Sequence, residues 1–318
     1  MHPALQALLS EQDGVVTRSQ VESAGLQPHE LRRLIRRREL VRLHPGVYVD
    51  HSGRPTFVQT AWAATLLHEP AALAAETALR MIEGPGSPRP EEPIHLAVER
   101  DRHHHGSRPG IVLHRTAHLN ERVMWHTGPP RQRYDEAVLD VTARAGSDFD
   151  ALGELSRAVQ SRRTTAARLR EALARRDRIR RRAWLDGVLA DVAAGTCSVL
   201  EQAYLQRVER AHGLPAAGRQ VQDRLGAGSV YRDVRYRVGV LVELDGRLFH
   251  DTTTQRDRDF DRDLDAAAGG LTTLRVSWGQ VFDRPCWTCS RIALVLRRAG
   301  WRGSVRPCGP ACMLRRAA

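Results

Sequence analysis

The chain of 318 residues contains no lysine. All 49 of its basic side chains are arginine, and 37 acidic side chains leave a formal charge of +12. Arginine keeps its charge under physiological conditions, so none of these cations can lose a proton and act as a base. The absence of lysine therefore excludes Schiff-base chemistry on a lysine and the Walker-A phosphate loop. The simplest explanation of the bias itself is a GC-rich coding sequence.

Long apolar runs and a leader-like start are also missing. No stretch approaches the roughly 18–20 apolar residues of a membrane helix, and Met1-His2-Pro3 does not open a signal peptide. We therefore expect no membrane partner and a cytoplasmic location, where the five cysteines stay reduced. With 42% hydrophobic and 27% charged residues, the composition is that of a soluble globular protein of two or three domains.

The charge is distributed unevenly along the chain. Residues 157–182 contain eleven arginines and two acids, and the residues after Asp283 contain eight arginines and no acid. Residues 183–283 instead contain fifteen acids and twelve arginines. A basic chain with one acidic segment indicates a protein that binds an anionic polymer around a metal site or an acid site. Solvated helix faces, or a solvated linker at 157–182, are the alternative for each arginine run.

Residues 1–52 predict a helical unit followed by a hairpin. Thr17 and Gln20 form a capping-box pattern, and a helix after Pro28 has an apolar face and a basic face. Two short strands then surround Pro45-Gly46. This is the order of a winged helix-turn-helix, in which the basic helix enters a DNA groove. The predicted nucleic-acid contacts are Arg32, Arg33, Arg36, Arg37 and Arg42.

The stretch GVVTRSQVESAGLQPHELRRLIRRRELVRLHPGVYV, residues 14–49, resembles the N-terminal winged helix of AbiEi-type antitoxins. The resemblance implies binding to DNA, often to the promoter of the protein's own operon, and a toxin as protein partner. A winged helix that serves as a scaffold or a protein contact is the alternative.

Residues 53–182 are expected to form an AbiEi-like middle domain with a basic helical linker. Two helices are predicted around Glu69-Pro70, and the segments PIHLAVER and GIVLHRTAHL predict paired strands. A helical pattern returns from Tyr134. The three histidines 103–105 favour an exposed loop over a metal site, because adjacent positions do not converge on one ion.

Residues 183–318 carry a pattern of carboxylates on predicted strands. Glu243 and Asp245 alternate with apolar residues and so face one side of a strand, and Asp233 lies on the strand before it. The order of helix, two strands, helix, strand and helix is that of a restriction-endonuclease-like αβα core. The whole chain is thus expected to be an α/β multidomain protein.

The stretches VLVELDGRLFH (residues 240–250) and RDFDRDLDAAAGGLTTLRVSW (residues 258–278) resemble Vsr-like endonucleases, which are relatives of the PD-(D/E)XK nucleases. Many actinobacterial proteins join such a domain to an AbiEi-like region. The resemblance implies hydrolysis of phosphodiester bonds with Mg²⁺ or Mn²⁺. It assigns the ion to Asp233 and Glu243, with Glu201 acting through water. It also implies roles for His250 as acid or base and for Arg256 and Arg262 as phosphate clamps.

Asp245 departs from the nuclease pattern, because it stands where the motif usually has lysine. The positive charge would then come from an arginine, from His250 or from the metal itself. Two alternatives stay open: a non-catalytic AbiEi-type regulator with a degenerate core, and a toxin–antitoxin protein that binds its partner with little DNA contact.

The cysteines suggest a second metal. The spacings of Cys286 with Cys289 and of Cys308 with Cys312 are typical of zinc ligands. Cys197 offers another set, which is Cys197, Cys286, Cys308 and Cys312. Structural Zn²⁺ and free buried thiols are the two interpretations of these residues.

Overall fold

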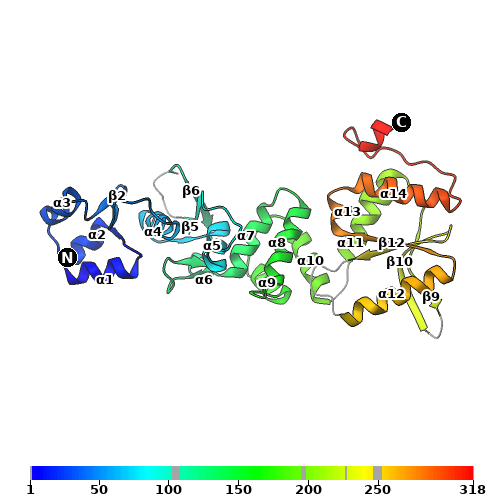
Figure 1. Cartoon of the computed structure of the whole chain (residues 1–318), viewed down its shortest axis with the longest axis horizontal. Coiled ribbons are helices and arrows are strands. Elements are labelled where there is room, and N and C mark those ends of the chain that lie inside the picture. Colours follow the sequence, from blue (N-terminus) through cyan, green and yellow to red (C-terminus); the bar gives the residue numbers. More distant parts are fainter. Residues whose placement is uncertain (1, 102–107, 195–197, 226–227, 246–252, 318) are drawn as a thin grey trace. The chain divides into compact units, whose positions relative to one another are not determined.

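The computed structural model describes residues 2–101, 108–194, 198–225, 228–245 and 253–317 (Figure 1). It confirms a mixed α/β fold with several sheets. The chain divides into two compact units, Met1–Val141 and Thr142–Ala318. The predicted division into three domains, with boundaries at residues 52 and 182, stays a prediction. None of the helices in the described segments is long and apolar enough to span a membrane, and the cytoplasmic location stays a prediction.

The first unit opens with three helices and a three-stranded sheet. The elements are α1 (Pro3–Glu11), β1 (Val15–Thr17), α2 (Arg18–Ser23), α3 (Pro28–Arg36), β2 (Val41–His44) and β3 (Val47–Val49). The strand order is β1-β3-β2, with antiparallel neighbours. The predicted helices after Thr17 and Pro28 and the hairpin are confirmed, while the short strand β1 was not predicted.

Local chemistry explains where these helices begin. The Thr17 hydroxyl accepts from the Gln20 backbone N–H at 3.1 Å, and the Gln20 side chain accepts from the Thr17 N–H at 2.9 Å. This is the predicted capping box, which satisfies two N–H groups that the first turn of α2 leaves without helical partners. Leu5, Leu31 and Leu40 are fully buried beneath the helices and form the centre of this small core.

The rest of the first unit surrounds a five-stranded sheet of order β6-β5-β4-β8-β7. Its elements are α4 (Phe57–Leu67), β4 (Ala71–Leu73), α5 (Ala75–Glu83), β5 (Ile94–Glu99), β6 (Ile111–Thr116), α6 (Leu119–Arg122), β7 (Val123–Met124) and β8 (Arg131–Gln132), and α7 (Tyr134–Arg144) leads on toward the second unit. The predicted strands β5 and β6 do pair, and they pair in parallel. The histidines 103–105 lie outside the described residues.

The second unit contains a four-stranded sheet of order β12-β11-β10-β9. Its elements are α8 (Asp148–Gln160), α9 (Ala166–Ala174), α10 (Arg182–Ala194), α11 (Ser198–Ala203), the π-helix η1 (Tyr204–Arg210), β9 (Gly218–Leu225), β10 (Gly228–Tyr236), β11 (Val240–Asp245), α12 (Thr253–Ala268), β12 (Thr272–Ser277), α13 (Trp278–Phe282), α14 (Pro285–Arg298) and the 3₁₀ turn η2 (Met313–Ala317). In Figure 1, α12 lies below this sheet, and α13 and α14 lie above it. The predicted order of helix, two strands, helix, strand and helix is confirmed, with β9 and α13 as additions, and its assignment to a restriction-endonuclease-like core stays a prediction.

The basic stretch at 157–182 is engaged in structure. Arg181 pairs with Asp148 at 3.1 Å and donates to the Ala145 carbonyl at 2.8 Å. Leu169 and Leu173 are buried on the inner face of α9. At least one arginine of this stretch therefore holds neighbouring segments together, and the stretch is not simply a solvated linker.

A buried polar network fastens η1 to the sheet. The hydroxyls of Tyr204 and Tyr236 lie 2.8 Å apart, and both side chains are essentially inaccessible to solvent. The Tyr236 hydroxyl also donates to Glu209 at 3.4 Å, and Glu209 accepts from Arg219 at 2.6 Å. Burial raises the pKa of both tyrosines and of Glu209. The network thus joins η1 to β10 and β9 through neutral hydroxyls and one ion pair.

We predict that Tyr236→Phe destabilises the protein more than Tyr204→Phe does. Tyr236→Phe removes the partner of the Tyr204 hydroxyl and one partner of Glu209, at a cost of about 1–3 kcal/mol. Tyr204→Phe leaves Tyr236 its bond to Glu209. The double substitution should cost less than the sum, because the two hydroxyls form one network. Urea unfolding of the four proteins measures these free energies, and strict additivity would contradict the network.

Candidate functional site

Five arginines form a basic surface on α3 and β2. Arg32, Arg33, Arg36 and Arg37 on and just after α3 and Arg42 on β2 are all exposed, and we call them the α3–β2 surface. Leu31 and Leu34, on the opposite face of α3, are buried. The apolar stripe thus fixes the helix orientation, and the guanidinium groups face outward.

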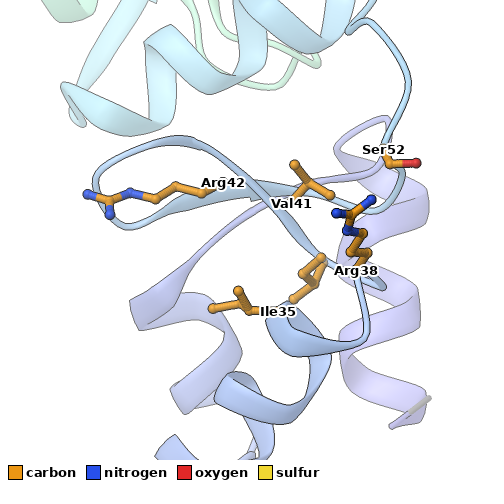
Figure 2. A pocket seen from close by; sticks show the side chains of 6 residues that line it. Ile35, Arg38, Val41, Arg42 and Ser52 are labelled. Carbon is orange, nitrogen blue, oxygen red and sulfur yellow. The ribbon is translucent and has the colours of Figure 1, made fainter.

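The helix and the hairpin meet at a shallow hollow of about 370 Å³ (Figure 2). Its lining residues are Ile35, Arg38, Leu40, Val41, Arg42 and Ser52. Figure 2 shows the Arg38 side chain pointing toward Ser52, while Arg42 extends away from the other labelled residues. The hollow is therefore lined by Arg38, two residues beyond α3, and by Arg42 of β2, so α3 and β2 contribute neighbouring parts of one surface.

The predicted carboxylates lie on two adjacent antiparallel strands. Val234 of β10 is paired with Val242 of β11, and Asp233 precedes Val234. The Asp233 carboxylate accepts from the Leu244 N–H at 2.8 Å, which brings it against β11 beside Glu243. A carboxylate offers about four lone-pair sites, so this hydrogen bond does not prevent Asp233 from binding a cation.

A cation that the sequence reasoning missed lies on the next strand. β11 and β12 pair in parallel, and Glu243 is the register partner of Arg275. Arg275 also pairs with Asp263 of α12, with an N–O distance of 2.8 Å. The segment LTTLRVSW was expected to be a strand, and Arg275 is its one cation. Only the strand register, however, places it beside Glu243.

The other predicted catalytic residues are only partly described. Glu201 lies on α11 and is half-buried. His250 lies outside the described residues, and Arg256 and Arg262 lie on α12 with side chains outside the description. The roles of these residues stay predictions.

Three of the predicted zinc ligands come together. The Sγ atom of Cys286 lies 3.6 Å from that of Cys308 and 3.6 Å from that of Cys312. His212 joins them, so that four ligand atoms lie within 4.8 Å of one another. Among the described residues, this is the group of three or more potential ligands that lie closely enough to hold a metal ion, and it contains no carboxylate.

The membership of this cluster differs from the sequence expectation. Cys289 is buried on α14 and is not part of the group, and Cys197 lies outside the described residues. His212 was not predicted, because its position just beyond η1 gave no spacing signal. Burial, followed by hydrogen bonding with Cys312 and Cys308, raises the pKa of Cys286 to about 12. Burial favours a higher pKa for Cys312, but hydrogen bonds with the backbone outweigh it and lower the pKa of Cys312 to about 6.

We predict that Asp233→Ala costs about 1 kcal/mol of stability, because it removes the acceptor for the Leu244 N–H. Asp233→Asn should cost less, since an amide oxygen can accept the same hydrogen bond. Urea unfolding of both variants measures the difference. A larger loss in the Asn variant would contradict a structural role for the acceptor. Asn is therefore the cleaner substitution for removing the charge alone.

The comparisons with known proteins concern the first of these sites. Residues 3–49 match the family model described as a transcriptional regulator, AbiEi antitoxin. The search of the curated proteins found no match to the chain. The family match spans the segment from α1 to β3 and so includes the whole α3–β2 surface.

Proposed function

We propose that the chain is a DNA-binding regulator whose residues 1–52 act as a winged helix-turn-helix. In this proposal α3 enters the major groove, and the β2–β3 hairpin is the wing that contacts the backbone. The observation that carries it is the α3–β2 surface, where five exposed arginines stand on a helix and strand anchored by a buried apolar core.

Physical chemistry favours a polyanion as the ligand of this surface. Arg32 and Arg36, like Arg33 and Arg37, are four residues apart and so lie on the same side along α3. Their planar guanidinium groups suit phosphate oxygens and the acceptor edge of guanine. Of the five, Arg37 lies 3.9 Å from Glu39, an exposed pair that contributes little. Among the described residues, neutralisation by the protein's own acids is therefore weak at this surface.

The family match supports the same proposal, because its description is that of a transcriptional regulator and antitoxin. A toxin as protein partner follows from that description and is part of the proposal. A protein that binds such a partner with little DNA contact is the competing view, and it predicts no strong dependence of duplex binding on salt.

We predict that Arg33→Ala/Arg36→Ala weakens binding to a random-sequence DNA duplex. It should also reduce the slope of log K against log salt by about 2, because each lost phosphate contact removes about 0.9. Fluorescence anisotropy over a salt series measures both quantities.

Arg297→Ala/Arg298→Ala is the matched control. It removes the same charge from two exposed arginines in the last turn of α14. It should leave the slope nearly unchanged. An equal effect of the two variants would mean that net charge alone governs binding. That result would contradict the proposal that α3 is the helix that contacts DNA. Absence of duplex binding by the wild type at low salt would favour the partner-binding view.

A metal-dependent endonuclease is the second candidate, and the adjacency of Asp233, Glu243 and Arg275 favours it. Asp233 and Glu243 would hold Mg²⁺ or Mn²⁺, since hard cations take carboxylate oxygens. The bound ion would polarise a phosphate and lower the pKa of a water molecule. Arg275 would supply, from β12, the charge that the missing lysine provides elsewhere.

We predict for this candidate that the wild type nicks supercoiled plasmid in the presence of Mg²⁺ or Mn²⁺. Asp233→Asn and Glu243→Gln should each reduce the rate about 100-fold or more, because each removes a charged ligand. Asp283→Asn, at an exposed position after α13, should retain activity. Equal nicking by all four proteins would identify a contaminating nuclease and overturn the candidate, without affecting the DNA-binding proposal.

A further inference from the structure

Three distant segments of the second unit meet at the cluster of His212, Cys286, Cys308 and Cys312. His212 lies just beyond η1, Cys286 lies in the first turn of α14, and the other two cysteines lie in the tail after α14. The Arg306 backbone N–H donates to the His212 carbonyl at 2.8 Å, so the tail is already held beside His212 two residues before Cys308. The backbone thus presents all four side chains to one point.

The sulfur separations match a tetrahedral metal site. With zinc–sulfur bonds of about 2.3 Å, two thiolates on one tetrahedral ion lie about 3.8 Å apart. The two measured Sγ–Sγ distances are both 3.6 Å. A disulfide would require about 2.05 Å, and Cys286 lies equally far from two partners. The arrangement is thus that of sulfur atoms around a common centre.

The surroundings of His212 also indicate a metal ion, independently of the sulfur distances. His212 is completely buried, and its Nδ1 lies 3.2 Å from the carbonyl oxygen of Val208. A carbonyl can only accept, so Nδ1 carries the proton and the lone pair is on Nε2. Within the described residues Nε2 is buried without a hydrogen-bond partner. An unsatisfied buried nitrogen is costly, whereas ligation through Nε2, with Nδ1 bonded to a carbonyl, is the usual arrangement of a metal-binding histidine.

We propose that His212, Cys286, Cys308 and Cys312 bind one structural zinc ion. Three sulfur ligands and one imidazole select zinc over hard cations. Four protein ligands complete the tetrahedron and leave no open position for substrate, which is the mark of a structural site. The ion holds the C-terminal tail and α14 to the end of η1. This site is separate from the Asp233–Glu243 carboxylates and does not depend on either proposed function.

The test measures zinc in the full-length chain purified without added metal. The wild type should contain about one zinc per chain. Cys308→Ser and His212→Ala should each reduce that content, and Cys289→Ser and Cys197→Ser should keep it. Cys289 is the matched control because it lies on the same helix, close in sequence to Cys286 but outside the cluster. Cobalt substitution adds a second readout, since visible d–d bands report tetrahedral coordination by three sulfurs and one nitrogen.

The outcomes are distinguishable even if a ligand variant fails to fold. A wild-type content below about 0.3 zinc per chain would overturn the proposal. Retention in His212→Ala with loss in Cys197→Ser would assign the fourth ligand to Cys197 and overturn the role of His212. In the wild type alone, removal of zinc by a chelator should speed the reaction of the exposed Cys308 with a thiol reagent at least tenfold. An unchanged reaction rate would also overturn the site.

Discussion

The hydrogen bond between the hydroxyls of Tyr204 and Tyr236 is the interaction on which the second unit depends. It joins η1 to β10 inside the core, where an unpaired hydroxyl would be costly. The helical segment fixed in this way consists of α11, which carries Glu201, and η1, which ends two residues before His212. The strand fixed in this way carries Asp233. This buried contact therefore ties the strand that carries Asp233 to the helical segment that leads to His212.

The absence of lysine has different consequences in different parts of the chain. In the second unit arginines are used structurally: Arg219 pairs with Glu209, and Arg207 pairs with Asp148 while lying over the Phe282 ring at 4.6 Å. These roles exploit the planar guanidinium group, which can bond in its plane and stack on its face. The α3–β2 surface differs because its arginines face solvent over an apolar base. A basic composition thus indicates a polyanion only where the fold leaves the charges exposed.

Local features of the fold were predictable because they depend on neighbouring residues. Thr17 and Gln20 encode a capping box within four residues, and the alternation around Glu243 encodes a strand. Strand β4 was missed because Ala71–Leu73 is short and follows a proline. The parallel pairing of β5 with β6 was not predicted either, since partner choice depends on the sheet and not on the strand's own pattern.

The sequence by itself determined the longer helices and strands, the basic face of α3 and the cysteine spacings, because these follow from periodicity and short-range chemistry; the short elements β1, β4 and α13, and strand β9, were not predicted. Tertiary structure decided which distant residues meet. It placed Arg275 beside Glu243 through the parallel register of β11 and β12. It also brought His212, rather than Cys289, to Cys286, although Cys289 is only three residues away along α14. The physical reason is that convergence on one point is set by packing and strand register, which a one-dimensional spacing does not contain.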